Sequence, residues 1–207
     1  MGKIITFAQQ KGGAGKTTIL AHLAHAWCSS KKSVALFDLD PQSSLTQWVS
    51  HTDLPVTLLE SKDYRAGRDL QEAASKFDYV LVDCPGSATS LLEAALRESD
   101  LVLVPCQPSA LDIWATGTLL DMARREKAPA RIVLNRVPPR VNLADAKEAM
   151  KGLGETVLKA RLGNRVAFIN GMASGTTALG LARKSKAVEE ITALKRETEA
   201  VLKKLGA

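Results

Sequence analysis

Aromatic residues, cysteines and long apolar runs are scarce in this sequence, and each scarcity argues against a class of protein. Phe, Trp and Tyr make up only 4% of the 207 residues, which argues against a surface that binds single-stranded nucleic acid by stacking. No stretch approaches about 18 consecutive apolar residues, so the sequence offers no transmembrane helix. The first residues lack the apolar core of a secretory signal. With 45% hydrophobic and 24% charged residues, the composition is typical of a soluble globular protein.

The three cysteines are odd in number and widely spaced. Cys28, Cys84 and Cys106 include no CxxC pair, a pattern that predicts a reducing cytoplasm and free thiols that behave as small apolar residues. An iron–sulfur cluster that bridges two subunits through Cys84 and Cys106 is an alternative. The spacing and the expected loop positions of these two cysteines disfavour it.

Positive charge exceeds negative charge, and the excess is uneven. The net charge is +6, and residues 183–207 carry an excess of three positive charges, half of the total. A basic surface of this kind suggests a polyanionic partner such as DNA. The basic residues of this segment are Arg183, Lys184, Lys186, Lys195, Arg196, Lys203 and Lys204. Arg136, Arg140 and Arg161, earlier in the chain, are further candidates for contacts with DNA.

Apolar, β-prone runs alternate with helical stretches along the whole chain. The runs at 80–82 and 101–104 are continuously apolar, as in strands buried on both faces of a parallel sheet. We expect strands at 3–9, 33–39, 56–59, 79–83, 101–105, 131–135 and 157–162. We expect helices at 16–29, 43–50, 65–76, 89–98, 110–126, 142–153 and 186–205, the last with Ser185 as its N-cap. The alternation predicts an α/β fold: a doubly wound, mostly parallel sheet with helices on both faces and ligands at the carboxyl ends of the strands.

A glycine-rich segment at residues 9–18, Gln-Gln-Lys-Gly-Gly-Ala-Gly-Lys-Thr-Thr, follows the first expected strand and opens the first expected helix. Glycines let consecutive backbone N–H groups face one anion, and the helix N-terminus adds its positive dipole end. Lys16 is expected to reach the β- and γ-phosphates of a nucleotide, and the Thr17 hydroxyl to bind Mg²⁺. A plain glycine-rich turn is the alternative, which the Gly-Lys-Thr-Thr run disfavours.

The loop departs from the general P-loop pattern, since Gln10 stands where that pattern has glycine and Lys11 lies inside the loop. Residues 11–18 match KGGxGKT[ST], and the sequence resembles the ParA/MinD family of deviant Walker A ATPases over nearly its whole length. Residues 37–42, Phe-Asp-Leu-Asp-Pro-Gln, and the Walker B segment at 79–85, Tyr-Val-Leu-Val-Asp-Cys-Pro, extend the resemblance. It is closest to the small ParA-type plasmid and chromosome partition ATPases. The resemblance implies one P-loop ATPase domain over residues 1–207, with ATP and Mg²⁺ as cofactors.

In that family two subunits enclose two ATP molecules face to face, and the resemblance implies a role for several residues. Lys11 would cross the interface to the other subunit's phosphates, the alternative being a solvated loop lysine. Asp40 would position the attacking water, a role compatible with capping the next helix. Asp83 would hold Mg²⁺ through water, and Asp38 would support the metal shell. The implied catalytic residues are Lys11, Lys16 and Asp40, and the implied metal-binding residues are Thr17, Asp38 and Asp83.

The resemblance also implies the remaining walls of the nucleotide site. Asn135, at the end of a later strand, would contact adenine, with residues 162–164 as the opposite wall. Gly86 and Ser87 would form a loop that senses the γ-phosphate. The implied nucleotide-binding residues are Lys11, Gly12, Gly13, Ala14, Gly15, Lys16, Thr17, Thr18 and Asn135.

Two other features favour ordinary packing over a special role. His22 and His25 lie three residues apart on an expected helix, but no third metal ligand has suitable spacing. We expect Trp48 and Trp114 to pack in the core or at its edge.

The closing helix leaves three alternatives open. It carries apolar residues at helical spacing, from Ile191 to Leu205, with basic residues elsewhere. We expect it to pack its apolar stripe on the sheet. A DNA-facing basic surface is a second interpretation, and a MinD-like membrane-targeting helix is a third, which the absence of Phe and Trp disfavours.

The sequence thus predicts a slow, partner-stimulated ATPase that dimerises with ATP and binds double-stranded DNA without sequence preference. A ParB-like centromere-binding protein or cargo adaptor would be its partner, and it would be cytoplasmic and nucleoid-associated, without membrane binding. A MinD-like membrane-cycling ATPase is the first alternative, and a metabolic ATP-dependent amide-forming enzyme is the second. With no helix-turn-helix before the first strand, operator-specific DNA binding is not expected. The cargo could be a plasmid, a chromosome or a protein assembly.

Overall fold

A computed structural model describes residues 1–61, 65–87, 89–140, 143–153, 156–182 and 184–206. The strands are β1 (Lys3–Phe7), β2 (Val34–Asp38), β3 (Val56–Leu59), β4 (Tyr79–Asp83), β5 (Leu101–Cys106), β6 (Ala130–Val137) and β7 (Thr156–Gly163). The helices are α1 (Lys16–Cys28), α2 (Ser44–Val49), α3 (Ala66–Ala74), α4 (Ser90–Arg97), α5 (Ala110–Arg125), α6 (Ala144–Lys151), α7 (Val166–Ala173), α8 (Ala178–Leu181) and α9 (Lys186–Leu205).

In the described part of the chain, these seven strands form one sheet in the order β3-β2-β4-β1-β5-β6-β7, and every pairing is parallel. The chain leaves β1 toward one side of the sheet and continues on the other side from β5 onward. This reversal puts a crevice at the carboxyl end of β1, where open α/β sheets bind their ligands. Phe7, Asp83 and Asp38 are in register across β1, β4 and β2, so their strands end at one line.

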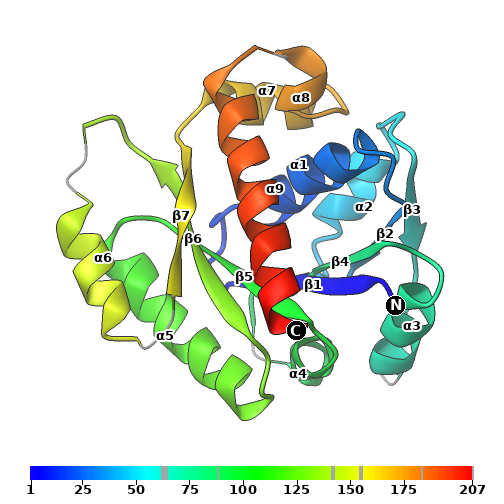
Figure 1. Ribbon diagram of the computed structural model, residues 1–207, viewed down its shortest axis with the longest axis horizontal. Helices are drawn as coiled ribbons and strands as arrows, with labels where there is room; N and C mark the ends of the chain where they lie inside the picture. The colour runs from blue at the N-terminus through cyan, green and yellow to red at the C-terminus, as the bar shows by residue number, and fades with distance from the viewer. Residues whose placement is uncertain (62–64, 88, 141–142, 154–155, 183, 207) are drawn as a thin grey trace.

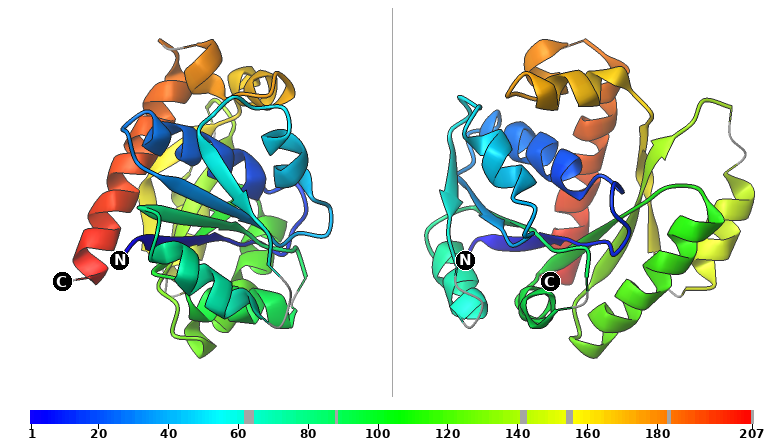
Figure 2. Two further views of the ribbon diagram at one scale, coloured as in Figure 1. Left: turned by 90° about the vertical axis from the view of Figure 1, so that its right-hand side faces the viewer. Right: turned by 180° about the vertical axis from the view of Figure 1, so that it is seen from behind.

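Both faces of the sheet are covered by helices, which explains the continuously apolar strands. Along β4, Val80 and Val82 belong to the core cluster that includes residues of α3, α4, α5 and α6, whereas Leu81 belongs to the cluster that includes residues of α1, α2, α7, α8 and α9. Figures 1 and 2 show the two helical layers on opposite sides of the sheet. Successive residues of a strand point to opposite faces, so only a strand buried on both sides needs apolar residues at every position.

The α/β fold and the parallel sheet expected from the sequence are confirmed, and each expected strand is present with boundaries shifted by at most two residues. The expected helix at 142–153 spans Ala144–Lys151 with Leu143 as its N-cap, and residue 142 lies outside the described residues. Two short helices, α7 and α8, were not expected. No helix among the described residues has the length and apolar character needed to cross a membrane.

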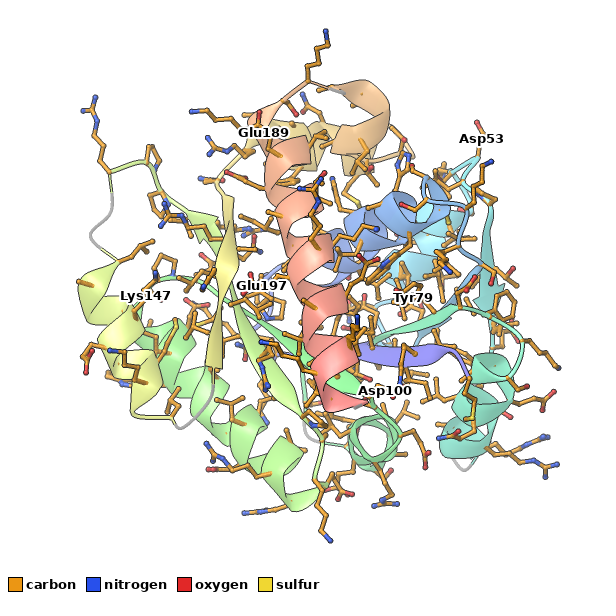
Figure 3. All side chains as sticks on the ribbon, in the orientation of Figure 1. Asp53, Tyr79, Asp100, Lys147, Glu189 and Glu197 are labelled. Atoms are coloured by element: carbon orange, nitrogen blue, oxygen red, sulfur yellow. The ribbon has the colours of Figure 1, made fainter. Side chains whose placement is uncertain are left out.

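The closing helix α9 lies along the outer strand β7, with Ser185 as its N-cap as expected. Glu197 accepts hydrogen bonds from the backbone N–H groups of Lys159 at 2.9 Å and Ala160 at 2.7 Å. Glu190 accepts one from the Gly163 N–H at 3.0 Å. Figure 3 labels Glu197 on α9 beside β7. Two carboxylates of the helix therefore satisfy backbone donors that a strand at the end of a sheet leaves unpaired.

Candidate nucleotide site

The glycine-rich loop connects β1 to α1 and is held in place by Gln9. This side chain is buried, and its amide donates to the Pro105 carbonyl at 3.0 Å and the Thr116 hydroxyl at 2.9 Å. Its carbonyl oxygen accepts from the Gln10 N–H at 2.8 Å. The two bonds of the amide nitrogen fix the loop to β5 and α5, so the loop starts from a rigid base.

Two glycines give the loop its shape. Gly13 has a φ of 74° and Gly15 a φ of 98°, both in the left-handed region that strains other residues. A Cβ on Gly15 would lie 2.3 Å from the Asn135 side-chain nitrogen. That nitrogen donates to the Ala14 carbonyl at 2.6 Å. Asn135 thus braces the loop, and its contact with adenine stays a prediction.

Lys16, the first residue of α1, points to the carboxyl end of β2. Its side chain is only 9% exposed, and its Nζ lies 3.8 Å from Oδ2 of Asp40. Asp40 also accepts from the Gln42 N–H at 3.0 Å through its other oxygen, Oδ1. The helix cap suggested for Asp40 is therefore a turn contact, since α2 begins two residues beyond Gln42. A buried ammonium at the start of a helix, beside a glycine-rich loop, is suited to bind phosphate.

Thr17 and Asp83 meet at the carboxyl end of β4. The Thr17 hydroxyl donates to Oδ2 of Asp83 at 2.5 Å, while the buried Oδ1 has no hydrogen-bond partner among the described residues. Burial raises the pKa of Asp83 to about 7, a rise opposed by the Thr17 hydrogen bond and by nearby Lys16. A buried, half-satisfied carboxylate next to a threonine hydroxyl offers the hard oxygen ligands that Mg²⁺ takes. The residues present therefore fit a magnesium ion between the loop and β4.

Asp38 has a different set of contacts. Its Oδ2 accepts from the backbone N–H and the hydroxyl of Thr46, at 2.8 and 2.9 Å, and its Oδ1 accepts from the Asp40 N–H at 3.2 Å. The side chain therefore fixes the turn between β2 and α2. Support of a metal shell by Asp38 stays a prediction, because both of its oxygens already have partners.

Lys11 is bound to its own chain. Its Nζ lies 2.6 Å from Oδ2 of Asp112, a carboxylate that is only 1% exposed, on the first turn of α5. Ser109, the N-cap of α5, donates to the same carboxylate oxygen and accepts from the Asp112 N–H. The Lys11 side chain itself is 37% exposed. The lysine is therefore accessible from outside but restrained by a buried partner.

Asp112 was not among the residues expected to act in the site, although the sequence carries a signal for it. Ser109-Ala-Leu-Asp112 has the Ser-x-x-acid spacing of a capping box, which places an acidic side chain at the start of a helix after a strand. Such helix starts lie at the same edge of the sheet as the glycine-rich loop. What the sequence does not indicate is that Lys11 reaches this helix.

A hollow of about 530 Å³ continues from the loop between α1, β6, β7 and α7. It is lined by Thr18 at the loop end and by apolar residues of α7 farther out. Asn135 and residues 162–164 all line it, and their role as the two walls of an adenine site stays a prediction. The hollow is large enough for a nucleoside. Gly86, beyond β4, also abuts the loop, since a Cβ there would lie 3.3 Å from the Gln10 carbonyl.

The two histidines of α1 have partners that agree with the expected packing role. His22 Nδ1 donates to the Thr18 carbonyl at 2.7 Å, and its Nε2 accepts from the Ala178 N–H at 3.0 Å. These two bonds require a neutral ring, and burial lowers the pKa of His22 to about 4. His25 contacts the Thr177 hydroxyl at 2.7 Å. His22 therefore links α1 to α8 beneath the hollow.

Trp48 is buried as expected, but the expectation for Trp114 is wrong. Trp114 is 70% exposed. Over the first two turns of α5, the polar residues Asp112 and Thr116 lie on the buried face and bind the glycine-rich loop. The large apolar side chains Leu111 and Trp114 therefore point outward.

The residues proposed from the sequence to bind DNA do not form one patch. Lys184 and Lys186 lie at the start of α9, whereas Lys203 and Lys204 lie in its last turn. A helix of 20 residues is about 30 Å long, which separates the two pairs. Lys195 forms an ion pair with Glu199 at 2.8 Å. Arg196 is exposed between the two ends, and Arg183 lies outside the described residues.

Comparison with known proteins identifies relatives along most of the chain. The sequence profile described as the CobQ/CobB/MinD/ParA nucleotide binding domain matches residues 5–178. The maintenance of carboxysome distribution protein A of Halothiobacillus neapolitanus is 33% identical over 205 residues, which cover 93% of this chain and 94% of that protein.

Solved structures share the fold. The cell division ATPase MinD of Pyrococcus furiosus superposes with a TM-score of 0.81 at 21% identity, covering 97% of this chain and 100% of that one. The septum site-determining protein MinD of Pyrococcus horikoshii, complexed with Mg-ADP, has a TM-score of 0.77 at 19% identity and covers 96% of both chains. At these identities the likeness shows the seven-stranded architecture of the described residues and no more.

Proposed function

Because the chain belongs to the CobQ/CobB/MinD/ParA family of nucleotide-binding domains, we propose that it is a ParA-type ATPase that dimerises with ATP and positions a cargo. One observation carries the proposal: Lys16 and Thr17 of the glycine-rich loop lie beside Asp40 and Asp83 at the ends of β2 and β4. We take residues 1–207 as one P-loop ATPase domain, which the single sheet of the described residues supports.

Each residue of this group has a chemical role in the proposal. The backbone N–H groups of the loop and Lys16 would bind the phosphates, and Asp40 would orient the attacking water. Bound Mg²⁺ would neutralise charge that develops on the phosphate oxygens, with Thr17 and Asp83 as its holders. Asp83 keeps one oxygen free of other partners, as this role requires.

Lys11 is the residue that would make hydrolysis depend on a second subunit. In the proposed dimer it leaves Asp112 and reaches the phosphates bound by the partner, where a cation stabilises the transferring group. The exposed side of Lys11 supports this, since the side chain can swing outward without unpacking the core.

The proposed dimer binds double-stranded DNA through its phosphates, without sequence preference, and releases it after a cargo-bound partner stimulates hydrolysis. The proposal therefore includes a cytoplasmic, nucleoid-associated protein and a ParB-like or adaptor partner. The proposed cargo is a plasmid, a chromosome or a large protein assembly, and the likeness to the carboxysome distribution protein supports the last of these.

The test measures mass and turnover together. Light scattering after size exclusion should give a dimer in ATP with Mg²⁺, and a monomer in ADP with Mg²⁺ or in ATP with a chelator. Hydrolysis should be slow and should require Mg²⁺. A protein that binds ATP and stays monomeric at every concentration tested would contradict the dimer switch, and a protein that binds no ATP would contradict the whole proposal.

A further inference from the structure

A second hollow, of about 320 Å³, lies at the carboxyl ends of β6 and β7, next to the first turn of α9. Figure 1 shows these three chain segments at the same upper edge of the molecule. We call it the arginine hollow. Its polar lining consists of Arg140, Arg161, Asn164, Arg165, Lys186 and Glu190.

The arginine hollow has more positive than negative charge, because only one of its cations is neutralised. Arg165 forms an ion pair with Glu190 at 2.6 Å, and this contact raises the pKa of the guanidinium. Arg140, Arg161 and Lys186 are exposed and have no ion pair within the described ranges of the chain. Three cations around one recess repel one another, so an anion in the recess would relieve that repulsion.

The backbone adds to this arrangement at two points. Arg140 has a φ of 66°, and Arg136, four residues earlier near the end of β6, has a φ of 50°. Residues with a Cβ rarely adopt this conformation, and it recurs at ligand sites. The positive end of the α9 dipole also lies at the hollow, since Lys186 is the first residue of that helix.

The arginine hollow shares a wall with the candidate nucleotide site. Gly163, Asn164 and Arg165 line both this hollow and the one assigned to the nucleoside. A ligand that orders this three-residue segment in one hollow therefore changes the wall of the other, which is a direct route for coupling the two sites.

We infer that the arginine hollow is the site where this protein binds the phosphate backbone of duplex DNA, with Arg140, Arg161 and Lys186 as the contacting cations. This inference rests on the proposed DNA-binding function, and it places the contacts with DNA away from the far end of α9. Lys203 and Lys204 lie about 25 Å along the helix from Lys186, too far to contact the same phosphates. Guanidinium groups with free donors pair with phosphate oxygens in bidentate geometry.

An anionic membrane is the competing polyanion, and the neighbouring helix argues against it. Val166 and Ile169 of α7, the helix that follows Arg165 in the chain, are 67% and 64% exposed, which gives a small apolar patch. However, α7 has only 8 residues, and Phe168, its one aromatic residue, is buried against His22. An interfacial helix needs a longer apolar face with bulky side chains directed outward.

The experiment compares two double variants with the same change of charge. Arg140→Glu with Arg161→Glu alters the arginine hollow, and Lys203→Glu with Lys204→Glu alters the far end of α9. Fluorescence anisotropy with a labelled duplex of mixed sequence, in ATP and in ADP, gives the affinity at several salt concentrations. The first variant should lose about tenfold or more in affinity, and its log–log salt slope should flatten by about 2 for each subunit, since each phosphate contact contributes about −0.9. The second variant should stay within about threefold of the wild type.

Controls separate this inference from the proposed function. Calorimetry should give unchanged ATP binding for both variants. The double variant Arg140→Gln with Arg161→Gln should also lose affinity for DNA, by a smaller factor, and its loss cannot come from introduced acidic residues. If the wild type binds DNA and the hollow variants bind equally well, or the far-end variant is equally weak, the inference is wrong while the proposed function stands. If the wild type binds no DNA in ATP but binds phosphatidylglycerol vesicles through Arg140 and Arg161, both are wrong.

Discussion

Lys11 and Asp112 form an ion pair of 2.6 Å in which the lysine is 37% exposed and the carboxylate only 1%. One buried oxygen of that carboxylate, Oδ1, has no partner among the described residues. The pair joins the glycine-rich loop to α5 within one subunit. In the proposed dimer Lys11 has to leave Asp112, so the free energy of this ion pair opposes dimerisation.

Asp112→Asn should therefore favour the dimer. The variant keeps the shape of the side chain and removes the charge that attracts Lys11. A half-exposed pair is worth up to about 1 kcal/mol, and the symmetric dimer breaks two of them, so the apparent dissociation constant of the ATP dimer should fall by up to about 30-fold. Sedimentation in ATP measures it. Asp121→Asn, which removes an exposed aspartate of the same helix, is the control and should change nothing; equal dimerisation of Asp112→Asn and the wild type would contradict the prediction.

Lys16→Ala should abolish nucleotide binding, since it removes the buried ammonium at the start of α1. Lys11→Ala is the matched comparison, because that lysine belongs to the same loop but points to α5. It should keep ATP binding in the monomer and lose the dimer and its turnover. Calorimetry distinguishes the two variants, and unchanged ATP affinity in Lys16→Ala would remove the nucleotide assignment of the loop.

Asp40→Ala should lower the rate of ATP hydrolysis, whereas Asp38→Ala should lower the stability of the fold. Asp40→Ala should bind ATP and hydrolyse it about 100-fold more slowly, the usual cost of losing one positioning group. Asp38→Ala removes three hydrogen bonds that hold the turn before α2, so its free energy of unfolding should fall by about 1–2 kcal/mol. Phosphate release and urea denaturation measure the two effects. Wild-type turnover in Asp40→Ala would leave that residue with a turn contact alone.

His22 should make the protein less stable in mild acid. Its pKa is about 4 when folded, against 6.5 for a free side chain, so the unfolded chain binds the extra proton between these values. Stability from His22 is complete above pH 6.5 and falls as the pH approaches 4, by about 3 kcal/mol over the whole range. His22→Gln keeps a donor and an acceptor without a titrating group. The difference in unfolding free energy between variant and wild type should follow this window; a difference independent of pH would contradict the prediction.

The sequence predicts the sheet well because its signal is local. Strands such as β4 and β5 are buried on both faces, and a short apolar run is all that this requires. Glycines and a Lys-Thr-Thr run likewise specify the loop, since left-handed backbone and phosphate ligands need those residue types. Local chemistry and local geometry coincide at these positions.

Features that depend on distant contacts could not be predicted in the same way. The segment of α7, Val-Ala-Phe-Ile-Asn-Gly-Met-Ala, is apolar on most sides and contains Gly171, so it shows no amphipathic period. Gly171 is needed because a Cβ there would lie 2.5 Å from the Thr177 backbone, a contact invisible in the sequence. The exposure of Trp114 follows from polar side chains of α5 that bind the glycine-rich loop, which is far away in the sequence. The pairing of Lys11 with Asp112 joins residues 101 positions apart.

Because the carboxylates that bind the β7 backbone belong to α9, the ribosome makes them some time after it makes β7. Gly163 and Glu190 are 27 residues apart in the chain, and at about 5–20 residues per second the ribosome needs roughly 1–5 s to add that segment. For that time the outer strand exists without the acceptors that later satisfy its amides. A nascent chain of this length can pair with the strand of another, which makes translation speed between β7 and α9 a determinant of how much protein reaches the folded state.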